Sequence, residues 1–163
     1  MTADSVPAFL AQLRRWAAEQ PAVHAVALVG SHARGEARAD SDVDLILLVE
    51  APEHHFAERR WVDTFGRPTD QAIEYYGTVR SLRVHYASGL EVEFGFTSVE
   101  WAKSPIDPGT QQVIAAGMWV LYERTPLLSP LLGRRRTPTI QSRLGSEAHY
   151  RTGLLFRSTG GQS

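Results

Sequence analysis

The fold of this chain is decided by the stretch Gly30-Ser31-His32-Ala33-Arg34-Gly35-Glu36-Ala37-Arg38-Ala39-Asp40-Ser41-Asp42-Val43-Asp44-Leu45. Apolar runs flank the middle of this stretch, residues 23–29 before it and residues 43–49 at its end. Both runs are short and rich in β-branched residues, which predicts two buried strands. Between the strands we expect a Gly-Ser turn, about two turns of helix, and a loop that ends in Ser-Asp-x-Asp.

The Gly-Ser pair offers a place for a phosphate group. Gly30 has no Cβ, so a ligand can come close to the backbone. Ser31 adds a hydroxyl group, and a helix that begins here presents free N–H groups and the positive end of its dipole. By itself, a Gly-Ser pair after a strand is usually only a turn, so this interpretation depends on the neighbouring residues.

The neighbouring residues are a pair of acids. Asp42 and Asp44 are two positions apart on a strand, so both carboxylates point to one face, while Val43 points into the core. The following residues are too apolar for an exposed edge strand, so the acids would be costly to bury without a partner. Carboxylate oxygens favour Mg²⁺, which commonly binds through one or two carboxylates together with substrate phosphates. The combined pattern predicts a site for a metal–nucleoside triphosphate.

Gly30-Ser31 followed by Asp42-Val43-Asp44 resembles the signature of the DNA polymerase β-like nucleotidyltransferase superfamily. The fuller string resembles its small bacterial branch, the minimal nucleotidyltransferases and their aminoglycoside-modifying relatives. The resemblance extends from about Val6 to Glu123. It implies an α/β (α+β) nucleotidyltransferase fold, in which helices pack on a mixed β-sheet.

The superfamily uses a third carboxylate on a strand beside the Asp-x-Asp strand. Residues 81–87 and 90–96 alternate apolar and polar side chains around Ser88-Gly89, which predicts a β-hairpin. By resemblance Glu93 is the third carboxylate, with Glu91 as the alternative. The family commonly has Asp here, so Glu is a departure with a longer reach. The other interpretation is that both glutamates only pair with Arg83 across the hairpin, which we favour for Glu91.

The resemblance implies a magnesium-dependent transfer of a nucleoside monophosphate to a hydroxyl group with release of pyrophosphate. AMP from ATP is the first candidate for the transferred group. Asp42, Asp44 and Glu93 are the expected catalytic residues and the ligands of two Mg²⁺ ions. Two metals about 4 Å apart stabilise both the attacking and the leaving oxygen.

The triphosphate of ATP or another nucleotide is expected on Gly30 and Ser31. Arg34 and Arg38 are four apart on the expected helix and share a face. We assign Arg34 to the nucleotide and treat Arg38 as a solvated or salt-bridged side chain. Ser41 is included in the nucleotide site, where its simplest role is to brace the loop before the acids.

The acceptor stays open at this point. In the minimal branch it is a separate helical, toxin-like partner protein, and a homodimer could also complete the site. A small-molecule, aminoglycoside-type adenylyltransferase is a second possibility. A non-catalytic module of the same fold, which binds a nucleotide or a partner, is a third.

The composition of the chain excludes several other classes of protein and of binding site. The 163 residues include no cysteine, which excludes disulfides and Cys-ligated zinc. A net charge of −1 gives no general attraction to nucleic acid or membranes. No apolar run approaches the roughly 20 residues that span a bilayer, and Met1–Ser5 lack the basic start of a signal peptide. We therefore expect a cytoplasmic protein.

The other elements follow from periodicity and from helix-breaking residues. We expect a first helix capped by Asp4 or Ser5 and ended by Pro21. We then expect a helix over 52–65, a short strand over 71–76, a helix over 110–116 and a strand over 118–123. Residues 1–129 would form the nucleotidyltransferase domain, and residues 130–163 a flexible Arg/Gly/Ser-rich tail.

Overall fold

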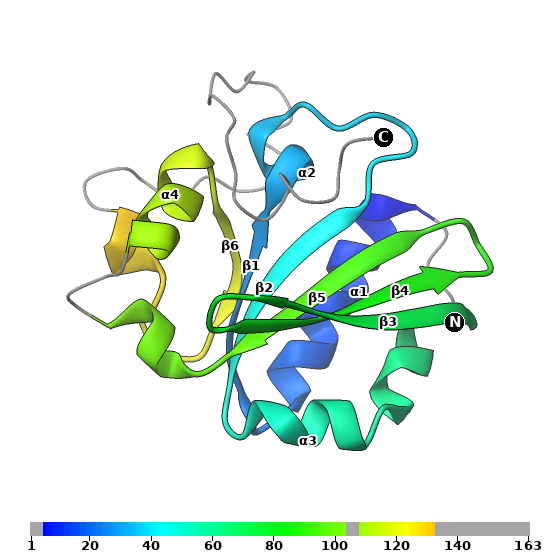
Figure 1. Cartoon of the computed structure of the whole chain (residues 1–163), viewed down its shortest axis with the longest axis horizontal. Helices are drawn as coiled ribbons and strands as arrows, with labels where there is room; N and C mark the ends of the chain where they lie inside the picture. Colours follow the sequence, from blue (N-terminus) through cyan, green and yellow to red (C-terminus); the bar gives the residue numbers. More distant parts are fainter. Residues whose placement is uncertain (1–4, 104–107, 133–163) are drawn as a thin grey trace.

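The computed structural model describes residues 5–103 and 108–132. Its strands form one six-stranded sheet in the order β3-β4-β5-β2-β1-β6 (Figure 1). The strands are β1 (Val23–Val29), β2 (Val43–Val49), β3 (Pro68–Tyr76), β4 (Val79–Tyr86), β5 (Glu91–Thr97) and β6 (Trp119–Glu123). β2 pairs with β5 in parallel, whereas the other neighbouring strands are antiparallel, so the sheet is mixed, as the family resemblance implies.

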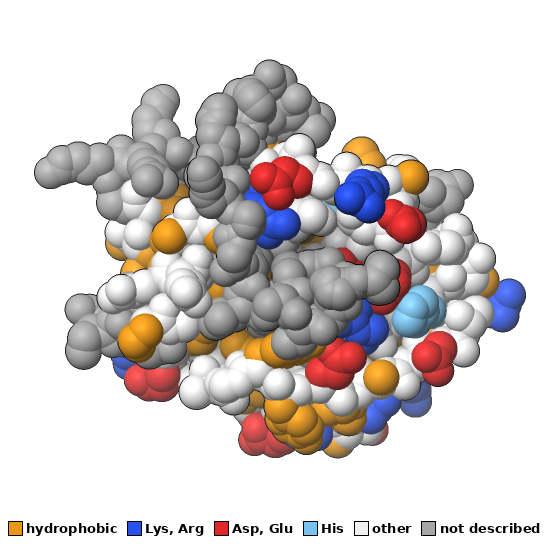
Figure 2. Space-filling model, turned by 45° about the horizontal axis from the view of Figure 1, so that its top comes forward, with side chains coloured by type: hydrophobic (Ala, Val, Ile, Leu, Met, Phe, Trp, Pro, Cys, Tyr) orange, Lys and Arg blue, Asp and Glu red, His pale blue; other side chains and the backbone are white. Residues whose placement is uncertain are grey.

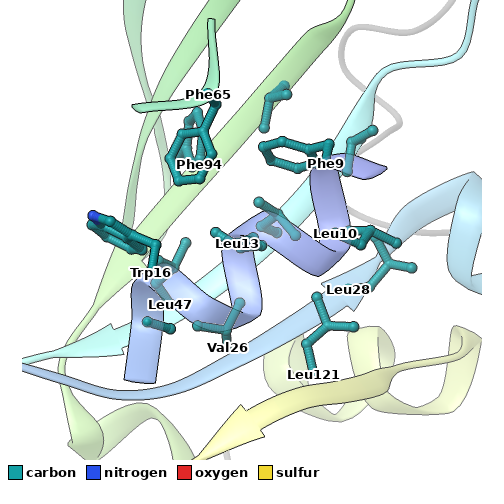
Figure 3. Packing of buried hydrophobic residues seen from close by; sticks show 14 of the residues in the cluster. Phe9, Leu10, Leu13, Trp16, Val26, Leu28, Leu47, Phe65, Phe94 and Leu121 are labelled. Carbon is teal, nitrogen blue, oxygen red and sulfur yellow. The ribbon is translucent and has the colours of Figure 1, made fainter. Parts of the chain in front are cut away.

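Helices cover both faces of the sheet. The α-helices are α1 (Val6–Glu19), α2 (Gly30–Arg34), α3 (Pro52–Ala57) and α4 (Pro108–Ala116), and the 3₁₀ helices are η1 (Arg60–Phe65), η2 (Val99–Ala102) and η3 (Ser129–Leu132). Figure 3 shows Phe9, Leu13 and Trp16 of α1 packed against the sheet, with Phe65 and Phe94 beside them. A second core cluster includes residues of η2 and α4 and lies on the opposite face.

The central strand β2 is buried along its whole length. Alternation sends Leu45 and Leu47 to the cluster that contains α1, and Ile46 and Leu48 to the other cluster. Burial on both faces explains why this strand is a continuous apolar run in the sequence. The expectation that it is not an edge strand is confirmed.

The first helix is capped by Ser5, whose side chain accepts a hydrogen bond from the Ala8 N–H at 3.2 Å. Asp4, the alternative cap, lies outside the described residues. The helix ends at Glu19, two residues before Pro21. Its buried residues are Phe9, Leu10, Leu13, Trp16 and Ala17, which recur at helical spacing.

The single helix expected over residues 52–65 is wrong. Glu58 adopts an extended conformation and ends α3, and a separate 3₁₀ helix, η1, follows. Two side-chain hydrogen bonds occupy carbonyl groups at this break. Arg59 Nε donates to Phe56 O, and Trp61 Nε1 donates to His55 O, both at 2.9 Å. The apolar positions still reach the core, because a 3₁₀ helix also exposes one face to its neighbours.

At the edge of the sheet, β3 begins at Pro68, three residues before the expected start, and forms a long hairpin with β4. The strand β6 is found where it was expected. The proposed boundary at residues 129–130 falls inside η3, and residues 133–163 lie outside the described part. Within the described ranges, no helix is long and apolar enough to cross a membrane.

Glu123 at the end of β6 holds the segment that follows it. Its Oε2 accepts hydrogen bonds from the N–H groups of Leu127, Leu128 and Ser129 at 3.1, 2.8 and 3.1 Å, and its Oε1 accepts one from the Ser129 hydroxyl. Burial alone would raise the pKa of Glu123, but these hydrogen bonds outweigh it and lower the pKa. The charged carboxylate is therefore the stabilising form.

We predict that Glu123→Gln lowers the free energy of unfolding by about 1–3 kcal/mol at pH 7, since the negative charge that strengthens these hydrogen bonds is removed and one acceptor oxygen is replaced by an NH₂ group. A carboxyl group with a lowered folded-state pKa stabilises the fold above its ordinary pKa of 4.5, and this contribution disappears as the pH falls. The difference between the wild type and the variant should therefore shrink below that value. Denaturant unfolding at a series of pH values measures it.

The matched control is Glu58→Gln, which removes an exposed glutamate elsewhere. We expect this variant to unfold as the wild type does at pH 7. A loss of stability for Glu123→Gln that stays constant down to acid pH would show that the charge of Glu123 is not what matters.

Candidate active site

The close approach of α2 to the acidic pair depends on Gly30. This residue has φ +80°, and a Cβ atom on it would lie 2.2 Å from Oδ2 of Asp44. Both the backbone conformation and the lack of space therefore require glycine here. The arrangement places the start of α2 directly against the Asp44 carboxylate.

The helix α2 is shorter than the sequence predicts. It has five residues and ends at Arg34, because Gly35 takes the left-handed conformation with φ +76°. The expectation of about two helical turns is thus wrong, and Arg34 and Arg38 do not share a helix face. Arg38 is exposed in the loop, where its backbone N–H donates to Ser41 Oγ at 2.8 Å. This contact gives Ser41 the bracing position that was expected.

The parallel pairing of β2 and β5 brings the three expected acids together. Asp42 directly precedes β2, Asp44 is its second residue, and the register places Asp44 opposite Glu93. One carboxylate oxygen from each residue lies within 4.8 Å of the other two, and all three residues are buried. Three hard oxygen donors at this spacing fit a divalent ion such as Mg²⁺. Their role as ligands stays a prediction.

A guanidinium group lies among these acids. Arg83 of β4 stands opposite Glu93 and forms ion pairs with Asp42, Glu91 and Glu93 at 2.8, 2.8 and 2.9 Å. It also donates from Nε and one terminal nitrogen to Glu74, both at 3.2 Å. The sequence predicts the pairing across the hairpin. It does not predict Asp42 or Glu74 as partners, although Glu74 could have been found once β3 was aligned with β4.

These contacts shift the pKa values of the cluster. Burial alone would lower the pKa of Arg83, but the hydrogen bond with Glu74 and the other carboxylates outweigh it and raise the pKa. Burial raises the pKa of Glu93, and the opposing charge of Arg83 does not cancel that effect. Burial also acts on Glu74, where the hydrogen bonds from Arg83 and Tyr76 prevail and lower the pKa. Glu93 is therefore the more basic carboxylate of the two.

The remaining predicted residues lie on α2. Ser31 and Arg34 are both 8% exposed. Arg34 Nε donates to Glu36 Oε1 at 2.8 Å. The Ser31 hydroxyl and one terminal nitrogen of Arg34 are buried and have no hydrogen-bond partner among the described residues. Two such donors on one short helix beside Asp44 suit an anion.

Charged side chains of both signs are visible on the surface of the described residues. In Figure 2, acidic side chains lie next to basic ones over the face that is turned forward. Lys103 is exposed and pairs with Glu100 at 3.3 Å.

A mixed sheet with helices on both faces and a buried group of acids beside a Gly-Ser turn defines the α/β class of nucleotidyltransferase folds. The model of the nucleotidyltransferase domain family matches residues 10–95, more than half of the 163 residues. The chain therefore belongs to this family of transferases. The match includes the Gly-Ser turn, both aspartates and Glu93.

Among solved structures, the chain is similar to an aminoglycoside 6-adenyltransferase from Bacillus subtilis. The two share 13% identity with a TM-score of 0.49, and the alignment covers 63% of this chain and 37% of that one. The chain thus spans well under half the length of that protein. None of the curated protein sequences matches the chain significantly.

We predict that Gly30→Ala disturbs the site more than a positive φ alone explains. Alanine in the left-handed conformation costs about 1–2 kcal/mol, and the added Cβ must also push Asp44 aside. Overpacking of this kind costs a further 1–3 kcal/mol or so. Denaturant unfolding of the variant measures the sum.

Gly77→Ala is the matched control, because Gly77 has φ +62° but open space around its missing Cβ. This variant should show only the cost of the backbone conformation. Equal losses of stability for both variants would contradict the close packing of Gly30 on Asp44.

Proposed function

We propose that this chain transfers a nucleoside monophosphate, AMP from ATP as the first candidate, to a hydroxyl group and releases pyrophosphate. The observation that carries the proposal is the group of three buried carboxylates within 4.8 Å, next to the start of α2, in a member of the nucleotidyltransferase domain family. The cytoplasm is the expected location.

In this proposal Asp42, Asp44 and Glu93 hold Mg²⁺, with two ions as the expected number. A bound divalent cation would neutralise the charge of the phosphates and help to align the reacting groups. Buried carboxylates suit this task because their oxygens are already held in place by two neighbouring strands. Glu93 is also the expected base for the proton of the acceptor hydroxyl.

The triphosphate is placed on Gly30, Ser31 and Arg34. Gly30 leaves room at the backbone, Ser31 offers a buried hydroxyl group, and Arg34 offers a buried N–H group. Ser41 contributes by bracing the loop that leads to Asp42. Phosphate oxygens would satisfy donors that the described residues leave without an acceptor.

The hydroxyl acceptor belongs either to a protein or to a small molecule. The resemblance to minimal nucleotidyltransferases favours a helical partner protein, and a homodimer could supply a further wall for the acceptor. ATP labelled at its α-phosphate separates these cases, because the label moves either to a protein band or to a small-molecule fraction.

A second candidate is a module that binds nucleotide or a partner without transfer. One observation favours it: Arg83 pairs with two of the three acids that would hold the metal. ATP binding without any labelled product, in the presence of the partner, would favour this candidate.

We predict that ATP binds more tightly with Mg²⁺ than without it. Asp44→Asn removes a proposed metal ligand, so it should lower the affinity for ATP in the presence of Mg²⁺ by at least about tenfold. Asp42→Asn should behave in the same way. Calorimetric titration with ATP, with and without Mg²⁺, measures the effect independently of the acceptor.

Asp40→Asn is the control, because Asp40 precedes the pair in the sequence but is exposed. It should leave the Mg²⁺ dependence unchanged. If the wild type binds no triphosphate with any divalent ion, the proposed transfer is wrong.

We predict further that Arg34→Gln weakens ATP binding by about tenfold, as expected for one lost charge-assisted hydrogen bond to a phosphate. Arg38→Gln, on the exposed loop, should change the affinity little. The same calorimetric titration compares them. Equal losses would mean that both arginines act only through the general charge of the surface.

A further inference from the structure

The guanidinium group of Arg83 uses all three of its nitrogen atoms within the acidic cluster. One terminal nitrogen contacts Asp42 and Glu91, both at 2.8 Å. The other contacts Glu93 at 2.9 Å and Glu74 at 3.2 Å, and Nε contacts Glu74 at 3.2 Å. Arg83 is thus a cation bound by four carboxylates.

Two of these four carboxylates, Asp42 and Glu93, are also proposed metal ligands. Their side chains are 8% and 4% exposed, and that of Arg83 is 17% exposed. A divalent ion held by the same two carboxylates would repel the guanidinium group, because the side chains are largely buried and solvent screens the charges little. The present contacts and a bound ion are therefore in competition.

The other two carboxylates, Glu74 and Glu91, would remain as ion-pair partners of Arg83. Glu74 and Glu91 are more exposed, at 35% and 29% of their side chains. Glu74 alone accepts two of the hydrogen bonds, and Tyr76 donates to the same carboxylate. If the contacts with Asp42 and Glu93 were lost, the guanidinium group would still be paired with the more exposed Glu74 and Glu91.

We propose that Arg83 is the counter-cation of the acidic cluster when no metal is bound, and that it releases Asp42 and Glu93 when a divalent ion binds while Glu74 and Glu91 retain it. This inference rests on the proposed function, because it assigns Asp42 and Glu93 to the metal. Arg83 is a positioning residue in this scheme. It keeps the buried acids paired before the ion arrives and makes ion binding weaker.

The test is the affinity for Mn²⁺ or Mg²⁺ alone, without nucleotide, measured by calorimetry on the full chain. Arg83→Gln should bind the ion at least about tenfold more tightly, because the ion no longer has to break partly buried ion pairs. The metal-free variant should also have a lower unfolding temperature than the wild type, and saturating metal should restore much of it. Unchanged or weaker metal binding in Arg83→Gln would overturn the proposal.

Arg80→Gln is the matched control. It removes a guanidinium group from the same strand, one that lies 4.1 Å from the ring centre of Phe56 rather than in the acidic cluster. Its metal affinity should stay close to that of the wild type. A gain equal to that of Arg83→Gln would overturn the proposal, since general charge would then explain both.

Two further measurements cover the case in which Arg83→Gln does not fold. Arg83→Lys keeps the charge but cannot bridge two carboxylates as a fork, so it should bind the ion more tightly than the wild type and less tightly than Arg83→Gln. In the wild type, the NMR signal of the Arg83 Nε–H group should shift at saturating Mg²⁺. An unchanged signal together with an unchanged affinity of Arg83→Lys overturns the proposal.

The outcomes separate this inference from the proposed function. Equal ion affinities of the wild type and the Arg83 variants reject the role of Arg83 and leave the metal site standing. Absence of ion binding in all of them rejects the metal site itself, and with it the competition.

Discussion

The parallel pairing of β2 with β5 is the constraint on which the site depends. The other pairings in the sheet are antiparallel, and three of them join strands that are consecutive in the chain, whereas β1 also pairs with the distant β6. A parallel pair needs a long connection, which here runs through α3, η1 and the hairpin of β3 and β4. The register then places Asp44 opposite Glu93. A shift by one residue would turn Glu93 into the core and bring an apolar side chain to the site.

The close contact between α2 and β2 adds the second half of the arrangement. Without a Cβ at Gly30, the backbone that begins α2 packs on the Asp44 carboxylate. The donors of Ser31 and Arg34 are therefore held at a fixed place relative to the acids. An anion on α2 and a cation on the acids would then be neighbours, which is the geometry that a metal–triphosphate needs.

The sequence predicted best the strands that are buried on both faces of the sheet. The runs of β1 and β2 are apolar throughout, so their bounds, residues 23–29 and 43–49, agree with the structure. Alternation in the hairpin likewise placed Glu93 on the face opposite the core. The family and the fold class followed from the same residues, and the family match confirms them. These features depend on local patterns that a single sequence carries.

The sequence did not predict features that depend on the conformation of one residue or on the pairing of distant strands. Gly35 ends α2 after five residues, although the residues beyond it are compatible with a helix. The extended conformation of Glu58 divides α3 from η1, and side-chain hydrogen bonds satisfy the carbonyl groups of His55 and Phe56 at the break. Glu74 joins the cluster because β3 pairs with β4 so that Ala72 faces Arg83, and Glu74 follows on the same side.

The contacts of Arg83 connect the stability of the chain with its proposed activity. Several carboxylates gathered at one partly buried place repel one another and lose hydration, so the metal-free fold needs a cation among them. Arg83 supplies such a cation from within the chain and pairs with two of the carboxylates proposed as metal ligands. The same ion pairs that favour a non-catalytic module thus also explain how an enzyme of this family can keep its acids buried before its metal arrives. An ion that displaces the guanidinium group from Asp42 and Glu93 would turn the same cluster from a set of internal ion pairs into a metal site.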